Sequence, residues 1–173
     1  MKKDAAPEFS RPLPVDKITA GGTEERLIAS AEERRLLTER FGLLDLQKLE
    51  ARFDIHPPHA DRTVTVTGTL VADVTQQCVV TLEPMHAHIE EDIDVLFTPD
   101  DAESDDLQDE ELEPIVNGVL DLGELAAQHM GAALDPYPRK PGLAYVELEY
   151  GGEGAAPGPL AKLVELKKPK DQT

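Results

Sequence analysis

Hydrophobic and polar residues alternate most regularly between residues 64 and 97. In "TVTVTGTLVADV" valine, leucine and alanine alternate with threonine, and in "HIEEDIDVLF" isoleucine, valine and phenylalanine alternate with acidic residues. A period of two residues is typical of a strand that has one buried face and one exposed face. With the apolar "CVVTL" between them, these segments predict an antiparallel meander that could curl towards a barrel. Gly68, inside the first run, predicts a bulge or a bend.

Two further patterns predict capped helices. Ser30 and Glu33 form a capping box ahead of an amphipathic segment, and Gly42 is a suitable stop for that helix. Asp121 and Glu124 form a second capping box ahead of another amphipathic segment.

Other segments are shorter or less regular. "FSRPLPVDKI" is typical of a proline-containing edge strand, "EERLIAS" of a second strand and "LAYVELEY" of a last one, whereas "LLDLQKLEARFDI" fits neither period cleanly. The sequence therefore predicts an α+β fold, with an antiparallel sheet, two capped helices and flexible tails. We expect a flexible N-terminus over residues 1–8, a single domain over 9–150 with a mobile acidic loop over about 98–113, and a flexible C-terminal tail over 151–173 with a short helix over 160–168.

The charge of the chain is concentrated in its middle. The formal net charge is −18, and residues 63–138 contain no Lys or Arg but 18 of the 35 acidic residues, so the rest of the chain is balanced. A field of this sign repels nucleic-acid phosphates and attracts basic proteins. We therefore expect no DNA binding, no strong binding of bare RNA, and a basic partner. The alternative is that the acidic residues only keep the protein soluble.

Several protein classes are excluded by what the sequence lacks. Cys78 is the only cysteine, so no internal disulfide can form and nothing indicates an oxidising compartment. No apolar run approaches the roughly 18–20 residues that span a bilayer, and the N-terminus has no apolar signal region. We therefore expect a cytoplasmic protein without membrane contact. No phosphate-loop, hydrolase or zinc-protease motif is present, so no cofactor and no catalytic residue is expected.

Cys78 is a candidate nucleophile because His86 and His88 follow it closely. A nucleophilic thiol needs a lowered pKa and an ordered base. By alternation, however, Cys78, Val80 and Leu82 share the buried face of a strand, where a thiol stays protonated. We therefore expect Cys78 to behave as a small buried hydrophobic residue.

His86, His88 and Glu90 would project from the same face of a strand because they are two residues apart. Two imidazoles and a carboxylate could hold a divalent metal ion with open positions, as a metal-dependent RNA-processing enzyme would need. The same face continues through Asp92 and Asp94, which is typical of a solvated strand face, and no fourth ligand is evident. The sequence favours the solvated face over the metal site.

The segment "DPYPRKPG" carries the first basic residues after the long acidic region. Tyr137, Arg139 and Lys140 lie there on a proline-stiffened loop and could bind a phosphate or an acidic peptide. The alternative is that both cations pair with acidic residues of the same molecule.

Two stretches resemble signature segments of the YceD family, which is named for large ribosomal RNA subunit accumulation. They are "GTLVADVTQQCVVTLEP" and "NGVLDLGELAAQHMGAALDPYPRKPG". "FSRPLPVDKI" and "PLAKLVELK" are similar to the alphaproteobacterial branch of the family, so the resemblance spans roughly residues 9–168. The residues that carry it are Cys78, Leu82, Glu83, Pro84, Asp121, Leu122, Glu124 and Leu125.

The chain departs from the family pattern at one place. Many members carry another cysteine near the positions of Arg139 to Gly142, and this chain has none there. The departure argues against a metal or disulfide role for Cys78.

The resemblance implies a ribosome-biogenesis factor that supports accumulation of large-subunit rRNA, and the family defines no catalytic residue. Genes of the family commonly lie next to the gene of a small protein of the large ribosomal subunit. With the charge map, this implies a non-enzymatic factor that binds a basic ribosomal protein or a large-subunit assembly intermediate. A small ligand inside a curled sheet is a further alternative. The residues expected to contact the partner are Glu90, Asp92, Asp94, Asp105, Asp106, Asp109, Glu110, Glu111, Tyr137, Arg139 and Lys140.

Overall fold

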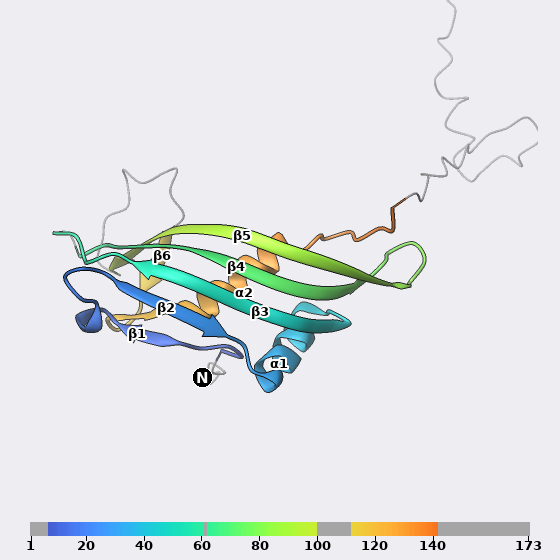
Figure 1. Cartoon of the computed structure of the whole chain (residues 1–173), viewed down its shortest axis with the longest axis horizontal. Helices are drawn as coiled ribbons and strands as arrows, with labels where there is room; N and C mark the ends of the chain where they lie inside the picture. The colour runs from blue at the N-terminus through green and yellow to red at the C-terminus, as the bar shows by residue number, and fades with distance from the viewer. Residues whose placement is uncertain (1–6, 61, 100–111, 142–173) are drawn as a thin grey trace, which may run out of the picture. The chain divides into compact units, whose positions relative to one another are not determined.

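The computed structural model describes residues 7–60, 62–99 and 112–141 (Figure 1). The elements in chain order are β1 (Pro12–Pro14), the 3-10 helix η1 (Val15–Lys17), β2 (Thr23–Ile28), α1 (Ala31–Phe41), β3 (Asp45–Ile55), β4 (Val64–Gln77), β5 (Pro84–Pro99), β6 (Leu112–Ile115), β7 (Val119–Asp121) and α2 (Leu122–Ala133). Five strands form one sheet in the order β2-β3-β4-β5-β6, and β1 pairs with β7 in a second, two-stranded sheet. All pairs are antiparallel except β5–β6, which is parallel.

This arrangement confirms the predicted α+β class. Over the residues described, the five-stranded sheet stays open, so its strands do not close into a barrel. No helix in the described ranges is long and apolar enough to cross a bilayer.

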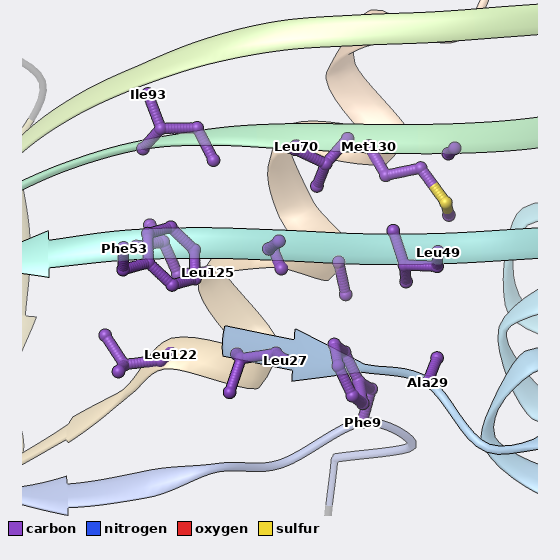
Figure 2. Packing of buried hydrophobic residues seen from close by; sticks show 14 of the residues in the cluster. Phe9, Leu27, Ala29, Leu49, Phe53, Leu70, Ile93, Leu122, Leu125 and Met130 are labelled. Carbon is purple, nitrogen blue, oxygen red and sulfur yellow. The ribbon is translucent and has the colours of Figure 1, made fainter. Parts of the chain in front are cut away.

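One face of the sheet is buried beneath α2 and the N-terminal segment. Helix α2 contacts β4 and β5, and Leu125 and Met130 of this helix lie in one cluster with Phe53 of β3 and Leu70 of β4 (Figure 2). Phe9, which is fully buried, completes the cluster from the N-terminal side. The opposite, outer face of the sheet carries the polar residues of the same strands, as expected for a sheet packed on one side only.

Strand β5 confirms the alternation expected from its sequence. Its core-facing residues are Ile89, Ile93, Val95 and Phe97, all of them buried, whereas Glu90, Asp92 and Asp94 between them are exposed. Glu91 lies on the core-facing side near the start of the apolar run and is half-buried.

Strand β3 explains why "LLDLQKLEARFDI" fits neither period. Its pairing with β4 shifts between Leu46 and Lys48, so Gln47 is an extra residue in the strand. After such a β-bulge, each side chain points to the face opposite to the one that simple alternation would give it. Leu46 is therefore buried before the bulge, and Leu49 and Phe53 are buried after it at odd spacing from Leu46.

The bulge predicted at Gly68 is not formed. The pairing of β4 with both neighbours continues without a register shift at this residue, where Gly68 lies opposite Phe53 and Ile93. A Cβ atom at Gly68 would clash with the carbonyl oxygen of Arg52 and would lie 2.8 Å from Cδ1 of Phe53. Glycine is therefore required here for close packing of two strands, which the alternation pattern could not show.

Helix α1 confirms its predicted caps. The Ser30 hydroxyl accepts a hydrogen bond from the Glu33 amide, the Glu33 carboxylate accepts one from the Ser30 amide, and Gly42 ends the helix at φ 62°. The left-handed conformation at the end is the one that glycine adopts without a steric penalty.

Helix α2 is capped by Asp121, but the predicted capping box is incomplete. The Asp121 carboxylate accepts hydrogen bonds from the amides of Gly123 and Glu124. The Glu124 carboxylate instead binds both terminal nitrogens of Arg40, at 2.7 and 2.8 Å. A two-point pair with a guanidinium is stronger than a hydrogen bond to a neutral amide, so Glu124 joins the two helices.

Several expected features lie outside the described residues: most of the N-terminus over 1–8, the acidic segment over 100–111, the strand over 143–150, and the C-terminal tail over 151–173 with its helix over 160–168. At the borders of the acidic segment, Thr98 and Pro99 belong to β5, and Leu112 and Glu113 belong to β6.

Candidate functional site

The acidic outer face of β5 is the first candidate surface. Glu90, Asp92 and Asp94 are exposed and lie opposite Val71, Thr69 and Thr67 of β4, so no base is their direct neighbour on that side. Among the described residues, no Lys, Arg or His forms an ion pair with any of the three. This surface therefore presents three uncompensated negative charges in a row.

His86 and His88 lie on the same face, as predicted, but each is bonded across the strand pair. Nδ1 of His86 lies 2.9 Å from the Thr75 hydroxyl, which also accepts a hydrogen bond from the Gln47 amide nitrogen. Nδ1 of His88 lies 2.6 Å from the Asp73 carboxylate. Thr75 and Asp73 therefore fix the orientation of the two rings towards β4. In the described part of the chain, no three His, Cys, Asp or Glu side chains are grouped to hold a metal ion.

The second candidate surface, which we call the tip, consists of the β4–β5 turn (Cys78–Glu83) and the loop after α2 (Asp135–Lys140). The two segments bind each other directly. The Val79 amide donates to the Pro138 carbonyl at 2.9 Å, and the Gln76 side chain donates to the Asp135 carbonyl at 2.9 Å. Nζ of Lys140 lies 2.7 Å from the Glu83 carboxylate. The tip is therefore built from two hydrogen-bonded segments that are far apart in sequence.

The predicted strand through Cys78, Val80 and Leu82 is wrong. Strand β4 ends at Gln77 and β5 begins at Pro84, and the residues between them form a turn in which the Leu82 amide donates to the Cys78 carbonyl. Cys78 is fully buried, but Val80 is 58% and Leu82 is 65% exposed. An apolar run of this length does not distinguish a strand from a tight turn that exposes its apolar side chains.

The expectation of an ordinary protonated thiol at Cys78 is also wrong. Hydrogen bonds from the Thr81 hydroxyl and the Thr81 amide, followed by those from the Lys140 and Val80 backbones, outweigh burial and lower the pKa of the Cys78 thiol to about 6. Hydrogen bonds that favour the charged form of a group lower the pKa of an acid.

We expect the Cys78 thiol to titrate with a midpoint near pH 6, followed by the ultraviolet absorbance of the thiolate. Because the folded pKa lies below the unfolded value of about 8.5, its contribution to stability is complete above that value and is lost as the pH falls through the folded pKa. Thr81→Val should raise the midpoint, since it removes the first of the hydrogen bonds. A midpoint above pH 8 in the unmodified chain would contradict this prediction.

Leu82 adopts a left-handed backbone conformation at φ 60°. For a residue with a Cβ atom this conformation costs about 1–2 kcal/mol. We therefore expect Leu82→Gly to be about 1 kcal/mol more stable than Leu82→Ala in urea unfolding. Val80 is the matched control, since it is exposed in the same turn without a positive φ, and there alanine should be the more stable substituent. The same order of stability at both positions would contradict the assignment of strain to Leu82.

The loop residues expected to bind a partner have separate roles in the structure. Lys140 forms the ion pair with Glu83, so for this residue the alternative of internal pairing is correct. Tyr137 is 70% exposed, and Arg139 is exposed beside it. The loop contact places Pro138, which follows Tyr137, next to Val79 of the turn, and sequence spacing could not reveal this.

The residues that carry the family resemblance fall into two groups. Asp121, Leu122, Glu124 and Leu125 are structural, because they cap α2, lie in the core or, in the case of Glu124, bind Arg40 of α1. Cys78, Leu82, Glu83 and Pro84 form the tip and the start of β5. Asp73 and Thr75 were not predicted from the sequence. They lie opposite His88 and His86 on the neighbouring strand, so the pairing of β4 with β5 is the signal that would have found them.

The fold and these surfaces define an acidic α+β protein with carboxylates exposed along one strand and with the tip at the end of that strand. The family described as "Large ribosomal RNA subunit accumulation protein YceD" matches residues 66–167. Because this is more than half of the 173 residues, the chain belongs to the YceD family. The family thereby gives the chain a role in the accumulation of large-subunit ribosomal RNA. Searches of the curated proteins and of the solved structures gave no match.

Proposed function

We propose that this chain supports accumulation of large-subunit rRNA without catalysing a reaction, by binding a basic ribosomal protein or an assembly intermediate that contains one. The observation that carries the proposal is the row of Glu90, Asp92 and Asp94, which are exposed and have no cationic partner in the described part of the chain. Complementary charge accelerates association and excludes partners of the wrong sign.

The charge of the chain favours a protein partner over bare rRNA. Each phosphate of an RNA backbone would meet the field of a molecule with net charge −18, and affinity for RNA depends on cations that replace counterions. A basic ribosomal protein is attracted by the same field, because its positive charges need acidic partners until it binds rRNA. The proposal therefore places the protein before or beside the RNA-binding step.

Other residues extend the proposed contact. Tyr137 and Arg139 are exposed at the tip, and Lys140 orders the tip through Glu83. The acidic residues that lie outside the described ranges and belong to the same proposal are Asp105, Asp106, Asp109, Glu110 and Glu111.

The residues that a metal-dependent reaction would use are not part of the proposed contact. The rings of His86 and His88 are each hydrogen-bonded to a β4 side chain. His86→Ala together with His88→Ala should therefore leave the binding of ribosomal proteins unchanged.

We expect the triple substitution Glu90→Gln, Asp92→Asn, Asp94→Asn to weaken binding of proteins extracted from purified large ribosomal subunits about tenfold at low salt, because exposed charge pairs contribute up to about 1 kcal/mol each. The measurement is capture on the immobilised full-length chain over a salt series, with identification of the captured proteins.

A control variant of equal net charge carries Asp16→Asn, Glu32→Gln and Glu39→Gln, since these residues are exposed but lie away from β5. The control should bind like the unmodified chain. Equal loss in both variants, or capture that does not depend on salt, would contradict the proposed function.

A further inference from the structure

Among the residues that the structure describes, none pairs with the outer edge of β5 over most of its length. Strand β5 pairs with β4 from Pro84 to Phe97, but β6 pairs only with Leu96–Pro99. Figure 1 shows β5 along the margin of the sheet. Within the described residues, no backbone group between Pro84 and Val95 forms a further hydrogen bond outside the β4 pairing. At about 3.4 Å per residue, this edge offers roughly 40 Å of unpaired backbone.

Long edges of this kind are usually protected. Lysines, prolines and bulges are the common devices, because an unprotected edge pairs with other strands. Between Met85 and Thr98, β5 contains no Lys and no Pro, and its pairing with β4 has no register shift. The charged residues along this edge are acidic, so the edge repels acidic strands and attracts basic ones.

The acidic residues decide which strand can be added. In an antiparallel pair of two copies centred on Asp92, Asp92 would lie opposite itself and Glu90 opposite Asp94. Like charges directly opposite each other destabilise a strand pair, whereas opposite charges stabilise it. A strand with a Lys or Arg at every second position would place its cations opposite Glu90, Asp92 and Asp94, at a Cβ separation of about 4.5–5.5 Å. The edge therefore selects a basic strand over a second copy.

We propose that the basic partner binds by adding an extended strand to the free edge of β5. This inference rests on the proposed function and specifies its geometry. The partner's basic residues occupy positions i, i+2 and i+4 on the outer face of the sheet. Its intervening residues lie on the core-facing side, where one is next to Ile93 and is apolar and the other is next to the half-buried Glu91. Backbone hydrogen bonds supply affinity, and the alternating charges supply the register.

The test uses synthetic peptides and the full-length, isotope-labelled chain. The first peptide alternates lysine with valine. The second has the same composition with its lysines consecutive, and the third is the alternating peptide with N-methyl groups on the amides that would face β5. We expect the first to bind about tenfold more tightly than the second, since three cross-strand charge pairs each contribute up to about 1 kcal/mol. The first peptide should also slow hydrogen exchange at β5 amides between Met85 and Val95. The third peptide should neither bind tightly nor slow this exchange.

A charge exchange provides a second, independent measurement. Asp92→Lys together with Asp94→Lys should lose affinity for the lysine–valine peptide and gain affinity for a glutamate–valine peptide of the same length. The matched control is Asp16→Lys with Glu39→Lys, which makes the same change of net charge on other elements and should leave the preference for the lysine–valine peptide unchanged.

Several results would overturn strand addition. Equal affinity for the first two peptides would mean that charge alone binds, in which case salt-sensitive capture of ribosomal proteins would still support the proposed function. Absence of protection at β5 amides, unimpaired binding of the N-methylated peptide, or a dimer that protects the same amides would each refute it. Failure of the unmodified chain to capture ribosomal proteins, by contrast, would refute the proposed function itself.

Discussion

Gly68→Ala is expected to lower the free energy of unfolding by about 3 kcal/mol, because inserting atoms into a closely packed site forces side chains and backbone to move. The added Cβ would overlap the carbonyl oxygen of Arg52 and lie 2.8 Å from Cδ1 of Phe53. Neither atom can move freely, since Arg52 is held in the β3–β4 pairing and Phe53 is fully buried. Urea unfolding followed by circular dichroism measures the loss.

Gly21→Ala is the matched control for this substitution. A Cβ at Gly21 has no atom within 4 Å, and the residue has no positive φ, so the change should stay within about 0.5 kcal/mol of the unmodified chain. A small effect at Gly68 would mean that β3 and β4 are less closely packed than the register shows. It would also weaken the conclusion that packing, and not a bulge, explains this glycine.

Asp121→Ala is expected to lower the free energy of unfolding by about 3 kcal/mol. The carboxylate accepts the Ser10 hydroxyl at 2.6 Å and the Arg11 amide at 2.8 Å, in addition to the two amides at the start of α2. Loss of a helix cap alone costs about 1 kcal/mol, and hydrogen bonds to a charged group contribute about 1.5–3 kcal/mol. The substitution therefore frees both α2 and the N-terminal segment that covers the core.

Asp121→Asn keeps an acceptor without the charge, so its loss should be intermediate. Asp135→Ala serves as the control, because within the described ranges the Asp135 carboxylate accepts only the Tyr137 amide, in an exposed turn, and we expect a loss below about 1 kcal/mol. If Asp121→Ala cost no more than Asp135→Ala, the contacts with Ser10 and Arg11 would not stabilise the fold. Thermal unfolding of the four proteins decides between these outcomes.

These two stability predictions separate folding from binding. Neither Gly68 nor Asp121 contributes a charge to the outer face of β5, so both variants should retain the binding of ribosomal proteins at temperatures where they are folded. The triple substitution on β5 should show the opposite behaviour, with reduced binding and nearly unchanged stability. The contrast follows from the one-sided sheet, in which one face holds the core and the other carries the carboxylates of the proposed contact.

The sequence alone determined the features that depend on neighbouring residues. The alternation in β5 assigned Ile93 and Val95 to the core and Asp92 and Asp94 to the outer face, because side chains of a strand point alternately to the two faces. The capping box at Ser30 was equally predictable, because its two hydrogen bonds join residues three positions apart.

The tertiary structure decided everything that depends on pairing between distant residues. The bulge in β3, the close approach at Gly68 and the partners of the two histidines all follow from the register of β3, β4 and β5. The hydrophobic pattern of one strand assigns its side chains to two faces, but it does not say which residue of the next strand lies opposite each of them. Glu124 binds Arg40, 84 residues away, and so leaves the capping box that its local sequence predicted. The turn at Cys78 also binds the loop after α2, and the Lys140 backbone of that loop contributes to the lowered pKa of the thiol. A local pattern fixes which way a side chain points, whereas only the fold fixes what that side chain meets.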